Sequence, residues 1–88
     1  MKITVRYFAR VREALGPGEE LDFEAGEPDA PATVGALRQW LAGRSALHAH
    51  ALAEDRALRA ACNLAMCDDD EPLSDGAEVA FFPPVTGG

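Results

Sequence analysis

The chain has few of the residues from which small domains build covalent staples or metal centres. Its 88 residues include two cysteines, Cys62 and Cys67, with no second pair and no histidine near them. Neither a disulfide framework nor a zinc site is therefore expected, and reduced thiols suit the cytoplasm. The first residues alternate between apolar and polar and form no long apolar run, which excludes a signal peptide and a membrane span at this end. We expect a single cytoplasmic domain with no membrane contact.

Basic residues are also scarce. There are eight Lys and Arg against 15 Asp and Glu, a formal net charge of −7, which disfavours nucleic-acid binding because phosphate contacts need clustered cations. All eight basic residues lie between Lys2 and Arg59, and the residues after Arg59 carry six acids and no base. This acidic part is either a solubilising surface or a field that steers the C-terminal end toward a basic cleft of a partner.

A catalytic set is missing as well. The sequence holds no Gly-rich phosphate loop, no Ser/His/Asp or Cys/His constellation and no recognisable acid pair. His48 and His50 are two residues apart, about 200° on a helix, so they cannot share a ligand there and are expected to face solvent. A domain of this size does not enclose both a core and a deep substrate pocket. We therefore expect no bound cofactor or metal and no catalysis by the isolated chain.

Apolar spacing predicts the first half of the fold. Ile3, Val5 and Tyr7 alternate with polar residues, which is typical of a strand with odd positions inward and Phe8 outward. The Gly-Pro-Gly sequence at 16–18 predicts a turn into a second strand, giving a hairpin over residues 2 to about 24. A helix should begin after Thr33 as N-cap and end near Gly43, with one apolar stripe.

The second half is predicted to complete the sheet. Residues 44–57 form either a short helix or an irregular connection, and 58–62 alternate as a third strand. Asn63 and Leu64 turn this strand into a short one at 65–67, and 79–82 form the last strand. One main helix among these strands indicates an α+β domain, a β-grasp (ubiquitin-like) mixed sheet over residues 1–84.

The most informative segment is FFPPVTGG, residues 81–88. Gly87 and Gly88 have no side chains, so a tail ending in them can be threaded through a channel too narrow for other residues. Pro83 and Pro84 should fix the direction in which the tail leaves, and the β-branched Val85 and Thr86 favour an extended chain. Residues 85–88 are therefore predicted to form an extended tail, which spans at most about 13 to 14 Å.

Three segments carry a family resemblance: FARVRE at 8–13, DGAEVA at 75–80 and FFPPVTGG at 81–88. They resemble the small subunits of molybdopterin synthase, within the ubiquitin-like sulfur carrier family (MoaD/ThiS). The resemblance implies that an E1-like adenylyltransferase uses ATP to adenylate Gly88 and that a sulfur donor protein supplies the atom that makes a thiocarboxylate. It also implies a large subunit in which this sulfur passes to a cyclic pyranopterin to build the molybdopterin dithiolene, and a heterotetramer of two small and two large subunits.

Strand parity adds a docking surface to this picture. In a β-grasp sheet the first and last strands are parallel neighbours, so Phe8 and Phe82 should lie close together near the tail. They would form an aromatic anchor for a partner, unless Phe82 packs only against Pro83 or a loop. The resemblance places Met66 in the same contact and assigns partner binding to the tail residues from Phe82 to Thr86.

Three other functions stay open at this stage. A carrier for thiamine thiazole synthesis would share the fold and the Gly-Gly end, although the sequence FFPPVT favours the molybdopterin carriers. A ubiquitin-like modifier would be joined through Gly88 to lysines of other proteins. A non-catalytic interaction domain would leave the tail unused.

Overall fold

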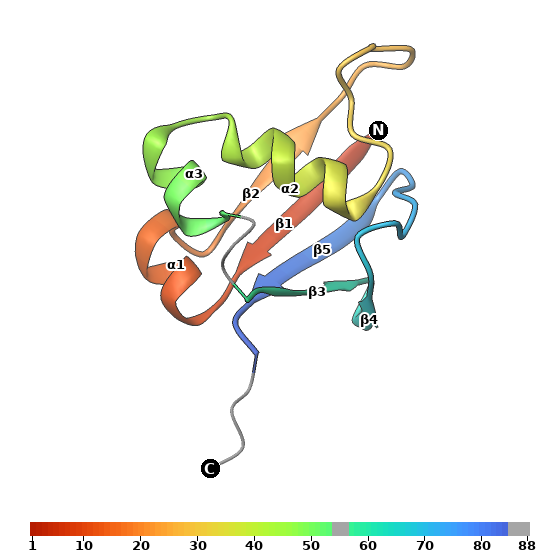
Figure 1. The fold of residues 1–88 in the computed structure, drawn as a ribbon. Helices are drawn as coiled ribbons and strands as arrows, with labels where there is room; N and C mark the ends of the chain where they lie inside the picture. Colours follow the sequence, from red (N-terminus) through yellow and green to blue (C-terminus); the bar gives the residue numbers. More distant parts are fainter. Residues whose placement is uncertain (54–56, 85–88) are drawn as a thin grey trace.

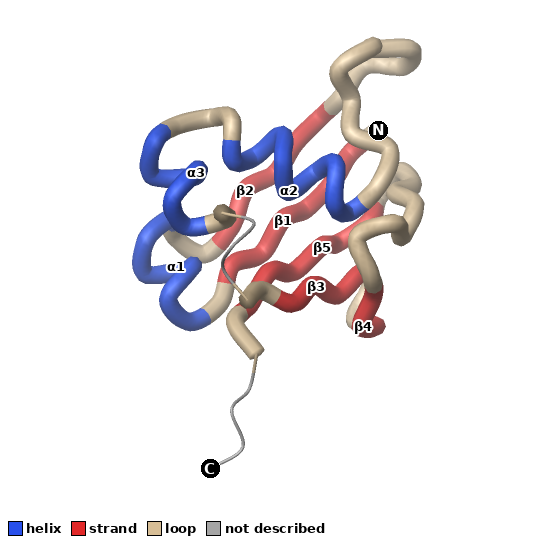
Figure 2. Tube along the Cα trace, in the orientation of Figure 1, coloured by secondary structure: helices blue, strands red, loops and turns tan. Residues whose placement is uncertain are grey.

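The computed structural model describes residues 1–53 and 57–84. Five strands form one mixed sheet in the order β2-β1-β5-β3-β4, with three helices (Figures 1 and 2). The strands are β1 (Lys2–Tyr7), β2 (Gly18–Asp22), β3 (Arg59–Cys62), β4 (Ala65–Cys67) and β5 (Ala77–Phe82). The helices are α1 (Ala9–Leu15), α2 (Val34–Ala42) and α3 (Ala46–Ala51).

The first and last strands pair in parallel near the middle of the sheet, as Figure 1 shows. Their register runs from Ile3 opposite Ala77 to Tyr7 opposite Phe81. The other pairs, β1 with β2, β3 with β5 and β3 with β4, are antiparallel. This arrangement confirms the predicted β-grasp fold and the predicted parallel pair.

The three helices lie on one face of the sheet (Figure 2). In α2 the predicted cap is present, because the Thr33 hydroxyl accepts a 3.1 Å hydrogen bond from the Ala36 amide. Inward side chains of the strands meet those of the helices in a single core, whose largest fully buried members are Tyr7, Phe81, Ile3, Leu37, Leu41, Leu52, Val5, Val11, Val34 and Val79. Inward residues alternate with less buried ones along β5, so the strand parity expected from the sequence holds.

The connection between β1 and β2 differs from the prediction. These strands pair as expected, but they are joined by helix α1 rather than by a turn alone. Val11 is the fully buried residue of this helix, and Gly16, at φ = 90°, ends it. The prediction of a direct hairpin is wrong, because Val11 can reach the core only if the chain turns back over the sheet.

The segment after α2 is partly helical, which decides between the two alternatives for the part of 44–57 that the structure describes. Helix α3 starts after Ser45, whose hydroxyl accepts a 3.0 Å hydrogen bond from the His48 amide. Its end carries Ala51 and Leu52 into the core. Within 1–53 and 57–84, no helix is long and apolar enough to cross a membrane.

The turn between β3 and β4 is the predicted one. Asn63 and Leu64 have left-handed φ angles of 50° and 69°, which a two-residue hairpin turn requires. Asn63 also binds β5 twice, because its amide donates to the Glu78 carbonyl at 2.8 Å and its side-chain oxygen accepts from the Glu78 amide at 3.0 Å. These bonds fix the hairpin against the strand that leads into the tail.

Candidate partner-docking site

The face of the sheet opposite the helices carries the residues predicted to dock a partner. We call it the open face. Its side chains are the outward ones of β1, β5, β3 and β4, namely Thr4, Arg6, Glu78, Ala80, Phe82, Arg59, Ala61 and Met66.

Strand register fixes how these residues lie. Met66 is opposite Ala61, Ala61 is opposite Ala80, and Ala80 is opposite Arg6, so one row crosses four strands. Because Ala61 and Ala80 have small side chains, the surface is lower in the middle of this row than at its ends. Met66, 61% exposed, stands at its β4 end. An exposed methionine beside small residues is an adaptable apolar contact.

The two predicted aromatic residues lie at the tail end of the same sheet. Tyr7 and Phe81 are the last register pair of β1 and β5, and Phe8 and Phe82 follow them directly. The Phe8 amide donates a 3.2 Å hydrogen bond to the Phe81 carbonyl, which keeps β1 against β5 to this point. Phe8 is 44% exposed, whereas Phe82 is half-buried. The structure therefore brings Phe8 and Phe82 to one end of the sheet, with Met66 farther out on β4.

The tail begins at the central strand of the sheet. β5 has β1 on one side and β3 on the other, and Pro83 and Pro84 follow Phe82 as half-buried residues. The predicted tail contacts Val85 and Thr86 and the predicted reacting residues Gly87 and Gly88 lie outside the described residues. What the structure does define is the base of the tail, next to the aromatic residues of the open face.

Charge on the open face is partly paired. Arg6 Nε lies 3.1 Å from Glu78 Oε2, an ion pair between neighbouring strands. Arg59 is opposite Phe82, is exposed, and forms no ion pair within residues 1–53 and 57–84. The sequence contained a signal for this placement, since the alternation of 58–62 puts Arg59 and Phe82 on the same face, but Arg59 was not predicted as a site residue.

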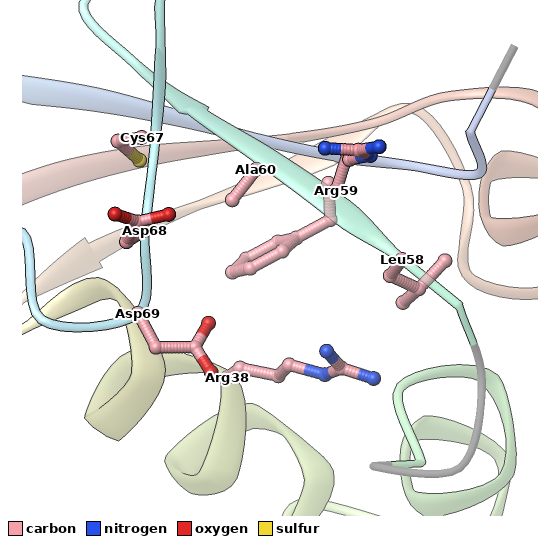
Figure 3. Close-up of a pocket in the computed structure, with 8 residues that line it drawn as sticks. Arg38, Leu58, Arg59, Ala60, Cys67, Asp68 and Asp69 are labelled. Atoms are coloured by element: carbon pink, nitrogen blue, oxygen red, sulfur yellow. The ribbon is translucent and has the colours of Figure 1, made fainter.

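A cavity of about 440 Å³ lies on the helix side of β3 (Figure 3). Arg38, Asp69 and Cys67 contribute to its wall. Buried Arg38 is already engaged, because its Nε donates to the Leu52 carbonyl at 2.8 Å and a second nitrogen donates to the Ala53 carbonyl. This side chain holds the end of α3 and is not aimed at a ligand.

The two cysteines are poor nucleophiles. Burial raises the pKa of both thiols, and the Glu71 carboxylate adds to the effect at Cys62. A raised pKa lowers the fraction of thiolate, which is the form that attacks electrophiles and binds metals. The described part of the chain also holds no group of three or more His, Cys, Asp or Glu residues able to bind a metal ion.

His48 was predicted to face solvent, and the structure shows this prediction to be wrong. Its Nε2 lies 2.8 Å from Glu19 Oε2, and its ring is half-buried between α3 and β2. Glu19 also receives 2.8 Å hydrogen bonds from the Tyr7 hydroxyl and from Arg44. No local pattern predicted this cluster, because Glu19 and His48 are 29 positions apart and meet only when α3 packs beside β2. His50 is exposed.

These features define a ubiquitin-like β-grasp domain whose last strand leads out of the middle of the sheet. The model of the ThiS family matches residues 5–88. The molybdopterin synthase sulfur carrier subunit of Escherichia coli is 51% identical over 98% of this chain and 99% of its own length, and that of Haemophilus influenzae is 36% identical over the same shares. The chain belongs to the ThiS family, together with these molybdopterin synthase sulfur carrier subunits.

Solved structures agree with this placement. A candidate molybdopterin converting factor, subunit 1, from Pyrococcus furiosus is 32% identical, with a TM-score of 0.74 over 97% of this chain and 99% of that one. SAMP1 from Haloferax volcanii is 26% identical, with a TM-score of 0.72 over 100% of both chains. Both comparisons cover the whole fold, the β-grasp sheet and its helices.

Proposed function

We propose that this chain is the sulfur carrier subunit of a molybdopterin synthase. The observation that supports this most strongly is 51% identity, over nearly the full length of both chains, to the sulfur carrier subunit of Escherichia coli. The open face supports it further, because it offers Phe82 and Met66 for docking, and the exposed Phe8 lies at the same end of the sheet as Phe82 and the base of the tail.

The chemistry takes place on the Gly88 carboxylate. A carboxylate is a poor electrophile, so an E1-like adenylyltransferase first joins it to the AMP part of ATP and releases pyrophosphate. A persulfide of the sulfur donor protein then attacks the acyl carbon, so that the new C–S bond forms as the C–O bond to AMP breaks and AMP leaves. A thiol reductant cleaves the remaining S–S bond, and the donor leaves as a disulfide. The product is a thiocarboxylate, which carries a sulfur nucleophile without free sulfide.

The loaded tail then enters the large subunit. Its sulfur passes to a cyclic pyranopterin, and two such deliveries complete the molybdopterin dithiolene. Enclosing the thiocarboxylate in the partner protects it from water. The chain itself contributes recognition through the open face and reach through its tail. Assembly as a cytoplasmic heterotetramer of two small and two large subunits belongs to the same proposal.

Intact mass spectrometry tests the central step. The purified chain is incubated with ATP, a sulfur source and its adenylyltransferase, and its mass should rise by the difference between one sulfur and one oxygen atom. A variant lacking Gly88 is the control and should keep its mass. An unchanged wild-type mass with an adenylyltransferase that is active on another carrier would refute the proposal.

A second function has one observation in its favour. SAMP1, the Haloferax volcanii protein with the same fold, is a small archaeal modifier, so conjugation of Gly88 to lysines of other proteins is the alternative. Mass spectrometry of digested cell extracts should then detect Gly88 in isopeptide bonds on several proteins. A carrier used only for sulfur transfer gives none.

A further inference from the structure

We propose that Arg59 binds a carboxylate at the entrance of the large subunit's tail pocket and thereby fixes the orientation in which the open face docks. This inference rests on the proposed function. It concerns a residue outside the apolar contacts and outside the tail, and it predicts the chemistry of one point on the partner.

Arg59 is placed at the base of the tail. It is the register partner of Phe82, the last residue of β5 before Pro83. Figure 3 shows its guanidinium on the other side of β3 from Arg38 and Asp69, although Arg59 also contributes to the wall of the cavity on the helix side. A partner that covers Phe82 must therefore also meet the Arg59 side chain.

Within residues 1–53 and 57–84, no ion pair neutralises the charge of Arg59. The neighbouring cation of the open face, Arg6, is paired with Glu78 at 3.1 Å, and Arg44 is paired with Glu19 at 2.8 Å. Across the β3–β4 ladder the nearest acid is Asp68, one residue beyond the Ala60–Cys67 pair. No ion pair joins it to Arg59 among the described residues, and Figure 3 shows the two charged groups well apart. An exposed guanidinium beside an apolar contact gains most when a partner supplies its carboxylate.

The surroundings make this cation distinctive. Every charged residue after Arg59 is acidic, so a complementary partner surface is mainly basic. One carboxylate in that surface would match Arg59 in a single orientation only. Rotated or shifted docking would place Arg59 against a basic group, which is a repulsive contact, and such contacts provide specificity.

The length of the tail separates this contact from the reaction centre. The six residues from Pro83 to Gly88 reach at most about 20 to 22 Å when extended. A tail inserted into a pocket carries Gly88 away from Arg59, which stays at the surface of the sheet. The counterpart of Arg59 is therefore a carboxylate at the rim of the pocket and not a phosphate of the bound substrate.

Binding of purified large subunit to charge variants tests the inference. Arg59→Glu should lower the affinity about 10- to 100-fold and Arg59→Gln about 3- to 10-fold, with both effects smaller at high salt. Arg12→Gln is the matched control, because it removes the same charge from an exposed position on α1, off the open face, and it should change the affinity less than about twofold. Replacing the facing acid of the large subunit by Arg should restore binding of Arg59→Glu. Thermal unfolding of each variant checks that the fold is intact.

The outcomes distinguish this inference from the proposed function. If wild-type chain gains no sulfur, the proposed function fails. If wild-type chain gains sulfur but Arg59→Glu binds the large subunit as tightly as wild type, only the inference fails. Equal losses for Arg59→Gln and Arg12→Gln would indicate net charge rather than a specific pair and would also overturn the inference. A loss of affinity for the adenylyltransferase alone would also overturn the inference, since the carboxylate is assigned to the large subunit.

Discussion

The hydroxyl of Tyr7, the last residue of β1, donates a 2.8 Å hydrogen bond to Glu19 Oε2 on β2. Tyr7 has no exposed surface, and the side chain of Glu19 is 20% exposed. Burial, and then the bond to Glu19, raise the pKa of Tyr7, so the hydroxyl remains a donor at any physiological pH. The pair links the two strands to α3 through His48.

Removing this hydroxyl should weaken the fold modestly. Tyr7→Phe keeps the ring in the core but leaves Glu19 with one donor fewer, so we expect a loss of about 0.5 to 1.5 kcal/mol in the free energy of unfolding. Urea denaturation at neutral pH measures it. Because Glu19 keeps Arg44 and His48 as partners, a loss well above this range would mean that the whole cluster collapses without Tyr7.

Glu19 should make the free energy of unfolding depend on pH in the acidic range. Burial opposes its ionisation, but the hydrogen bonds from His48 and Tyr7 and the charge of Arg44 outweigh burial and lower its pKa below the ordinary value of 4.5. A carboxyl whose pKa is lower in the folded state adds stability above its unfolded pKa, and this stability is lost as pH falls through the folded pKa.

The difference between wild type and Glu19→Gln isolates this effect from the other acids. The wild type should be more stable at pH 6, and the gap should shrink as pH falls below 4.5. Urea denaturation at several pH values measures both proteins. A gap that stays constant down to pH 3 would contradict the assignment.

Met66 should matter for docking and not for folding. Met66→Ser removes an apolar side chain that is 61% exposed on the open face, so we expect an affinity for the large subunit about tenfold lower and little change in unfolding temperature. Leu47→Ser is the matched control, because Leu47 is 54% exposed but lies on α3. Surface plasmon resonance measures both, and equal losses would show that the binding surface is not the open face.

Gly35 should not tolerate a side chain. A Cβ at this position of α2 would come within 2.8 Å of Asp69 Cβ and 3.0 Å of the Asp69 carbonyl, which accepts a 2.7 Å hydrogen bond from the Gly35 amide. Gly35→Ala should therefore cost about 1 to 3 kcal/mol of stability.

Gly43→Ala serves as the control for that substitution. Its nearest neighbour would be the Trp40 carbonyl at 3.5 Å, an ordinary contact, and its φ of −79° suits alanine. Thermal unfolding should leave this variant at least as stable as wild type. If Gly35→Ala is as stable as Gly43→Ala, the loop after β4 that carries Asp69 must shift to accommodate the added side chain at little cost in stability.

Much of the fold followed from local patterns. Alternation in β1 and β5, the cap and apolar stripe of α2 and the Asn63–Leu64 turn each carried their own signal, and parity along strands placed Phe8 and Phe82 at one end of the sheet. Helix α1 was missed although Val11 and Leu15 are four residues apart, because the strand pattern before it and the glycines after it suggested a direct turn.

The rest depended on contacts between distant segments. His48 looked like a surface residue because nothing near it in the sequence requires an imidazole, and its partner Glu19 is 29 positions away. Arg59 looked ordinary for a similar reason, since its significance lies in what surrounds it on the open face. Local propensity carries no information on such contacts between residues that are distant in the sequence.

The position of β5 has a consequence for how the protein is made. Residues 77–82 are translated after the other strands but occupy an inner place in the sheet, so β1 and β3 have no common neighbour until this segment has left the ribosome. A product that stops before Ala77 lacks that strand and cannot complete its core. Quality control would remove such fragments, and the folded pool would consist of molecules synthesised through to the base of the tail.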